Sequence, residues 1–74
     1  MNWQEYIMSN PEIMFGKPCI KGTRISVDLV VEKLANGETI EYLLTAYPRL
    51  TKEGILACLQ YAAESVRNET IYAA

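Results

Sequence analysis

The last two thirds of the chain hold three amphipathic segments, each with its own helix-start and helix-stop residues. Ser26, Thr39 and Thr51 are good N-caps, because a hydroxyl oxygen can accept a hydrogen bond from a free N–H of the first turn. Gly37 suits a left-handed cap at the end of the first segment. Pro48 ends the second, since the residue before a proline disfavours helical dihedrals. The sequence therefore predicts three consecutive helices.

Apolar residues recur with helical spacing in all three segments. The predicted apolar faces are Val27, Val30, Val31 and Leu34 in the first helix, Ile40, Leu43, Leu44 and Tyr47 in the second, and Ile55, Leu59, Ala62 and Val66 in the third, widened by Leu56 and Ala63. About four residues, 47–50, join the last two helices. This short corner between amphipathic helices favours a helix-turn-helix arrangement, and a generic three-helix bundle is the alternative.

The first quarter of the chain is rich in turn signals. Apolar runs at residues 6–8 and 13–15 flank Ser9-Asn10-Pro11-Glu12, a strong turn signal. Lys21-Gly22 offers a second tight turn, because glycine adopts positive φ freely. This pattern predicts a small β-hairpin ahead of the helices.

The chain is short enough to form one domain at most. We predict a mainly α protein, in which an N-terminal β-hairpin precedes a three-helix bundle. Residues 1–25 form the hairpin and a basic arm, residues 26–67 form the bundle, and residues 68–74 form a frayed tail.

Positive charge gathers in one stretch of an otherwise acidic chain. Residues 13–26 contain three basic and no acidic residues, whereas the remainder contains four basic and nine acidic residues. Such segregation indicates a local surface that faces an anion. With the helix-turn-helix corner, it suggests phosphate contacts with DNA. The candidate DNA-binding residues are Lys17, Lys21, Arg24, Arg49, Thr51 and Lys52.

Structural roles remain open for several of these candidates. The alternative for Arg24 is an ion pair with an acid such as Asp28 or Glu32, and the alternative for Thr51 is the capping role already assigned. The third helix begins with Lys52 followed by an acid and a glycine, which offers few groups for reading bases. Phosphate contacts from one copy would be weak and sensitive to salt, so we expect a homodimer on a palindromic site.

Composition argues against catalysis. The chain has no histidine, so the commonest general base and metal ligand is missing, and we predict no enzyme activity, metal or cofactor. Cys19 and Cys58 have no paired spacing, which is typical of reduced thiols in the cytoplasm. No apolar run approaches the length of a membrane span, so no membrane partner is expected.

Several motifs in fixed order resemble those of one family of short prokaryotic proteins. The motifs are Ser9-Asn10-Pro11-Glu12-Ile13, Gly16-Lys17-Pro18, Ile20-Lys21-Gly22-Thr23-Arg24-Ile25, Val27 and Tyr47-Pro48-Arg49-Leu50-Thr51. The family is catalogued as domain of unknown function four-three-three, and its members are similar to antitoxins of the VapB type. The resemblance implies a homeodomain-like helix-turn-helix preceded by a β-hairpin. It also implies binding of a PIN-like nuclease toxin and repression of a shared operon.

Two functional hypotheses follow from these observations. The first is an antitoxin-like, DNA-binding regulator of a toxin–antitoxin operon. The second is a protein-interaction module without affinity for DNA, in which the tyrosines and the apolar N-terminal residues contact a partner. Four apolar residues are candidates for such an interface or for the hairpin core: Trp3, Met8, Met14 and Phe15.

Overall fold

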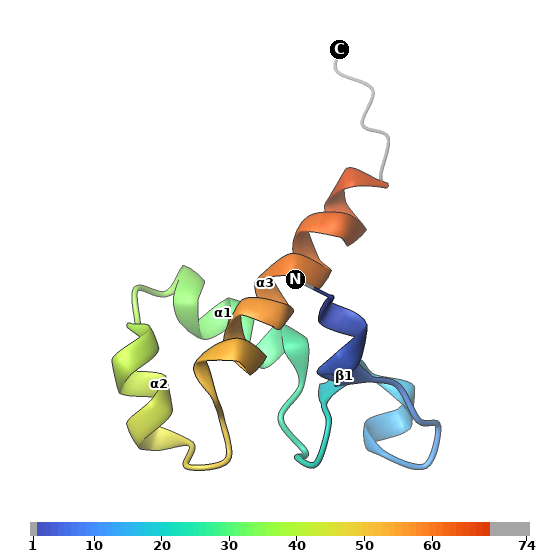
Figure 1. Ribbon diagram of the computed structural model, residues 1–74, viewed down its shortest axis with the longest axis horizontal. Helices are drawn as coiled ribbons and strands as arrows, with labels where there is room; N and C mark the ends of the chain where they lie inside the picture. Colours follow the sequence, from blue (N-terminus) through green and yellow to red (C-terminus); the bar gives the residue numbers. More distant parts are fainter. Residues whose placement is uncertain (1, 69–74) are drawn as a thin grey trace.

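The computed structural model describes residues 2–68 and contains a small hairpin followed by three α-helices (Figure 1). The strands are β1 (Ile7–Met8) and β2 (Cys19–Ile20), and the helices are α1 (Val27–Ala35), α2 (Ile40–Ala46) and α3 (Lys52–Arg67). Short 3₁₀ turns precede each strand, η1 at Trp3–Glu5 and η2 at Met14–Gly16. The predicted fold class is thus confirmed. Of the predicted frayed tail, Asn68 caps α3 and residues 69–74 lie outside the described residues.

The three predicted N-caps all act as caps. The side-chain oxygen of each accepts a backbone hydrogen bond from three residues on, at 3.4 Å for Ser26, 3.0 Å for Thr39 and 3.0 Å for Thr51. Such a cap contributes about 1 kcal/mol to helix stability. Gly37 ends α1 with φ of +93°, and α2 stops just before Pro48. Local sequence signals therefore set the helix boundaries.

The hydrophobic core draws on both strands and all three α-helices of the described residues. Its buried residues are Ile7, Ile20, Val27, Val30, Leu43, Leu50, Ile55, Ala57 and Cys58. The faces predicted for α1 and α2 are confirmed, because their members are buried or packed against this core. Ile7 pairs with Ile20 across the hairpin, so both strands point into the same core as the helices. The hairpin is thereby an integral part of the fold.

The apolar face predicted for α3 is partly wrong. Ile55 is buried as expected, but the small residues Ala57 and Cys58 line the core beside it. Leu59 and Val66, which were expected in the main stripe, are 39% and 63% exposed. The cause is that α3 is apolar around most of its circumference, so hydrophobic period alone does not identify the inward face. Packing against α1 selects the side with small residues.

The hairpin differs from the predicted one in its second strand. The turn at residues 10–13 forms, with the Ile13 N–H donating to the Asn10 carbonyl over 2.9 Å. The chain then continues through η2, and β1 pairs antiparallel with β2 instead of with residues 13–15. Local apolar pattern suggested the wrong partner because strand pairing is decided by which run can bury its side chains in the core.

The four apolar N-terminal candidates have four different environments. Trp3 packs edge-to-face on Tyr61 of α3, with ring centroids 4.8 Å apart, and donates a hydrogen bond to Glu64. Met14 contacts the Cys19 thiol. Phe15 is fully exposed on a left-handed turn, with φ of +57°. Met8 lies in β1, partly exposed. Trp3 thus joins η1 to α3.

Candidate nucleic-acid interface

A tight turn directly after β2 places the middle of the basic segment at the surface. The Thr23 N–H donates to the Ile20 carbonyl over 3.1 Å, and Gly22 between them has φ of +76°. This is the turn predicted at residues 21–22, with glycine at the position that needs positive φ. Lys21 and Arg24 on either side of the turn are both exposed.

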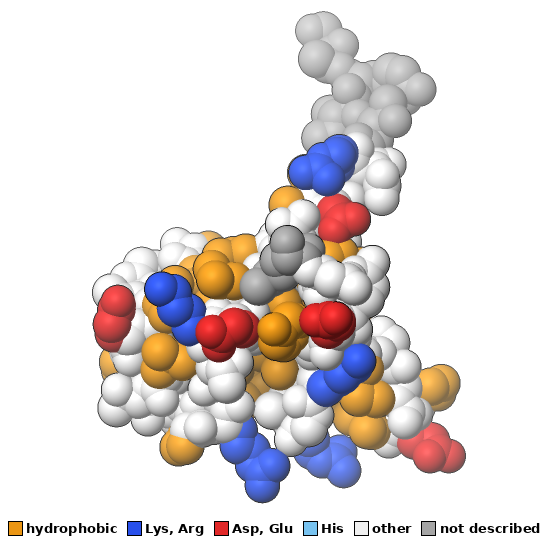
Figure 2. Space-filling view, in the orientation of Figure 1, with side chains coloured by type: hydrophobic (Ala, Val, Ile, Leu, Met, Phe, Trp, Pro, Cys, Tyr) orange, Lys and Arg blue, Asp and Glu red, His pale blue; other side chains and the backbone are white. Residues whose placement is uncertain are grey.

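The α2–α3 corner lies against this turn. The Arg49 guanidinium donates a hydrogen bond to the Gly22 carbonyl, with an Nη1–O distance of 3.2 Å. Both segments lie along the lower edge of the molecule in Figure 1, and blue side chains project from that edge in Figure 2. The exposed cations of this region are called the cationic edge: Lys21, Arg24, Arg49 and Lys52.

The first turn of α3 completes the cationic edge. Gly54 is buried, and a Cβ at this position would lie 3.6 Å from the Ile20 side chain, so α3 begins close against β2. Thr51 caps the helix through its Oγ1. Lys52 is exposed, and so is the acidic Glu53 beside it. Close packing at Gly54 therefore brings the start of α3 to the basic turn.

An open depression of about 500 Å³ lies beside the contact between the turn and the corner. Its walls are formed by Met8, Ile13, Gly22, Thr23, Arg24 and Arg49. Two arginines thus border one hollow that contains no acidic residue. The sequence motifs include Ile13 and Thr23, and Met8 is a candidate for an interface or for the hairpin core, but none of the three was predicted to border the basic residues. The only indication in the sequence was that these residues lie close to the basic residues or the quoted motifs along the chain.

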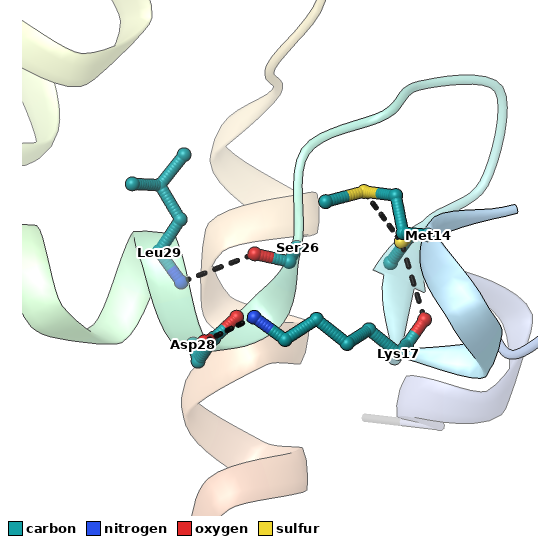
Figure 3. Close-up of polar contacts among 6 residues, drawn as sticks. Met14, Lys17, Ser26, Asp28 and Leu29 are labelled. Carbon is teal, nitrogen blue, oxygen red and sulfur yellow. Dashed lines mark hydrogen bonds and ion pairs between the residues drawn. The ribbon is translucent and has the colours of Figure 1, made fainter.

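Lys17 lies in a different environment from the cationic edge. Its ammonium pairs with the Asp28 carboxylate over 2.9 Å, as drawn in Figure 3. The Ser26 hydroxyl and then this ammonium lower the pKa of Asp28 by hydrogen bonding. Lys17 borders an apolar groove between α1 and α3, whereas Arg24 and Arg49 border the depression. Lys17 is therefore held in an exposed ion pair away from the cationic edge.

The predicted site residues thus separate into groups. The structure brings together Lys21, Arg24, Arg49 and Lys52, with Thr51 between the last two. Of the alternatives left open, Thr51 does cap α3, and Asp28 pairs with Lys17 instead of Arg24. Within residues 2–68, Arg24 forms no ion pair. DNA contact by any of these residues stays a prediction.

Both thiols are shielded from solvent. Burial raises the pKa of Cys58 from 9.0 to about 11. Cys19 is only 2% exposed, and its thiol donates to the Lys17 carbonyl over 3.2 Å. In the described part of the chain, no three acidic or cysteine side chains gather in a way that would hold a metal ion. None of the helices between residues 2 and 68 has the length and hydropathy of a membrane span.

Comparison with known protein families identifies residues 7–62 as a match to the family described as "Protein of unknown function (DUF433)". The chain belongs to this family. The matched region runs from β1 into the second half of α3 and so contains the whole cationic edge. The family description assigns no function.

Two relatives are similar over most of this chain. The uncharacterized protein y4eO of Sinorhizobium fredii is 37% identical over 59 residues, which is 80% of this chain and 27% of y4eO. The crystal structure of a DUF433 member from Anabaena variabilis is 31% identical, with a TM-score of 0.80, over 86% of this chain and 63% of that one. The chain spans only about a quarter of y4eO, so that protein contains much else besides this fold.

Proposed function

We propose that this DUF433 protein is an antitoxin-like regulator that binds DNA phosphates through its cationic edge. The observation that carries the proposal is the hydrogen bond from Arg49 to the Gly22 carbonyl. It joins the helix-turn-helix corner to the basic turn, so that cations from three chain segments face solvent together. Guanidinium forks and mobile ammonium groups are the side chains that proteins use to bind phosphate.

The same surface supports backbone contacts better than base recognition. The outward face of α3, which enters the major groove in a helix-turn-helix protein, carries Leu56 and Leu59 where polar side chains would read bases. Lys52 is the single cation in the first turn of that helix. The proposed binding therefore depends on phosphates and is strongly weakened by salt.

The remaining parts of the proposal come from the resemblance to VapB-type antitoxins. We propose a PIN-like nuclease toxin as protein partner, autorepression of the shared operon, a homodimer as the active form and a cytoplasmic location. Binding and not catalysis is the proposed activity. The absence of histidine from the sequence and the burial of both thiols support this choice.

Fluorescence anisotropy with a labelled duplex from the upstream region of the gene tests the DNA part. Four phosphate contacts predict that the logarithm of the association constant for DNA falls with the logarithm of the salt concentration with a slope of about −3.6. Arg24→Gln should reduce the slope by about one, whereas Lys33→Gln, a matched charge change in α1 away from the cationic edge, should not alter it. Absence of binding at low salt would remove DNA from the proposal.

Co-expression with the product of an adjacent nuclease gene tests the antitoxin part separately. Rescue of growth and loss of RNA cleavage in the purified complex are the expected results. A nuclease that stays fully active and does not co-purify would contradict this half and leave DNA binding untouched.

A second candidate function is favoured by one observation, the apolar outward face of α3. Leu56, Leu59 and Val66 are all more than a third exposed. A protein-interaction module without affinity for DNA would use this face and not the cationic edge. The charge-neutralising variants above separate the two functions, because they would leave such a module unaffected.

A further inference from the structure

The outward face of α3 has the residue spacing of a helix–helix seam. Its apolar members, at successive intervals of three, four and three residues, are Leu56, Leu59, Ala63 and Val66. These intervals are those of the a and d positions of a coiled coil. All four side chains are exposed, although hydrophobic residues of this size usually contribute to a core or an interface. No other part of residues 2–68 covers them.

The polar residues beside this seam follow the same repeat. Glu53, Gln60 and Arg67 are separated by seven residues each and therefore lie along one flank. The flank is acidic at the start of the helix, neutral in the middle and basic at the end. Glu53 and Arg67 form no ion pair within the described chain. Two copies of this flank that run in opposite directions would therefore place acidic against basic residues at both ends.

We propose that α3 pairs with α3 of a second copy, in antiparallel orientation, through this face. In a two-fold interface, residue i contacts residue j and residue j contacts residue i. Antiparallel pairing brings Glu53 of each copy to Arg67 of the other, with Gln60 near the two-fold axis. Parallel pairing would instead place the two flanks on opposite sides of the seam, so that Glu53 and Arg67 would have no partner of opposite charge. The occupant is a second copy because the charge pattern is self-complementary.

Other features of α3 fit this arrangement. Ala63 near the middle of the seam lets two helices approach closely. The second half of α3 extends past α1 and α2 and is accessible from the side (Figure 1). A membrane surface is a poorer occupant, because Lys52 and Arg67 are the only cations along α3. The seam from Leu56 to Val66 is about 15 Å long, which predicts a dimer of micromolar rather than nanomolar affinity.

The proposal deepens the homodimer of the proposed function by locating its interface, and it rests on that part of the function alone. Two copies paired in this way have their Lys52 Cα atoms about 27 Å apart, at opposite ends of the pair. The two cationic edges then lie at opposite ends of the pair.

Sedimentation equilibrium of the reduced full chain, without DNA, tests the interface. We expect dimers at protein concentrations of about 100 µM. Leu59→Glu should raise the dimer dissociation constant roughly 100-fold, because it places a charge in the seam of each copy. Circular dichroism shows whether this variant still folds. A monomer at about 1 mM, or an unchanged dimer in folded Leu59→Glu, would overturn the proposal.

Charge exchange on exposed residues tests the orientation without disturbing the core. Glu53→Arg should weaken the dimer about tenfold by setting arginine against Arg67, and the double variant Glu53→Arg with Arg67→Glu should restore it. Glu41→Arg on α2 carries the same charge change and should have no effect. An unchanged dimer with Glu53→Arg would overturn the antiparallel arrangement.

Cross-linking provides a second measure of orientation. Gln60→Cys near the two-fold axis should form a disulfide-linked dimer under mild oxidation, whereas Glu53→Cys should not. Equal cross-linking of both variants would contradict antiparallel pairing. A monomer that still binds DNA would contradict the proposed interface but not the proposed regulator. A dimer without affinity for DNA would contradict the proposed regulator but not the interface.

Discussion

The cationic edge and the outward face of α3 are two exposed surfaces with opposite chemistry. The edge is built from three chain segments that a hydrogen bond and close packing hold together. The outward face belongs to one helix and is apolar, with polar residues on a single flank. Electrostatic binding weakens with salt, whereas burial of apolar surface does not. The two surfaces can therefore be tested independently in one molecule.

Triple charge reversal of the cationic edge should have the largest effect. Lys21→Glu, Arg24→Glu and Arg49→Glu together replace three proposed phosphate ligands with three repelling groups, and we expect DNA affinity to fall at least about 1,000-fold. Anisotropy measures this loss, and sedimentation of the same variant should show an unaltered dimer. Loss of both properties together would mean that the surfaces are not separate.

Salt should separate the two surfaces in the unmodified protein. Between 50 and 200 mM salt, affinity for DNA is expected to fall about 100-fold through release of counterions from the four contacted phosphates. Dimerisation measured over the same range should change little, since apolar burial supplies most of it. A dimer that dissociates with salt as steeply as the DNA complex would show that charge, not the seam, holds it.

Alkaline pH should expose the contrast between the inward and outward faces of α3. Below pH 9 the Cys58 thiol is protonated in the folded and the unfolded chain. From pH 9 to about 11 only the unfolded chain loses this proton, so the stability supplied by Cys58 falls, by about 2–3 kcal/mol in total. Urea unfolding at pH 8 and pH 11 measures the loss. Cys58→Ala should lack this component, and an identical pH profile would contradict burial of the thiol.

Single neutralisations should rank Arg24 above Lys17, although both lie in the basic segment. Arg24 is exposed without an ion pair in the described residues, while Lys17 is held by Asp28. We expect Arg24→Gln to weaken DNA binding several-fold and Lys17→Gln to leave it within about twofold. Equal effects in a salt titration would place Lys17 at the interface despite its pairing.

The smallest expected effect is at Phe15, outside both surfaces. Its φ of +57° costs an L-residue about 1 kcal/mol relative to glycine, and its exposed ring gains little from burial. Phe15→Gly should therefore raise the free energy of unfolding slightly, by up to about 1 kcal/mol, with DNA affinity and dimerisation unchanged. Destabilisation in urea titrations would show that the Phe15 ring makes a stabilising contact, contrary to its full exposure in the structure.

The amino-acid sequence by itself determined the helices, because caps and stops act on neighbouring residues. Ser26, Thr39 and Thr51 begin helices through hydrogen bonds three residues away, and a glycine or a proline ends them. The turn at Gly22 is equally local. From these signals alone the fold class and the position of the basic turn were correct.

Only the tertiary structure decided which residues far apart in the chain are in contact. The strand partner of β1, the inward face of α3 and the contact of Arg49 with Gly22 all join residues far apart in the chain. Each depends on which side chains fit the shared core. Because α3 is apolar around most of its circumference, its sequence does not show which face is buried. The pairing of Lys17 with Asp28 was settled in the same way. Long-range packing therefore separated the cations of one basic sequence segment, with Lys17 in an ion pair and with Lys21 and Arg24 in the exposed cationic edge.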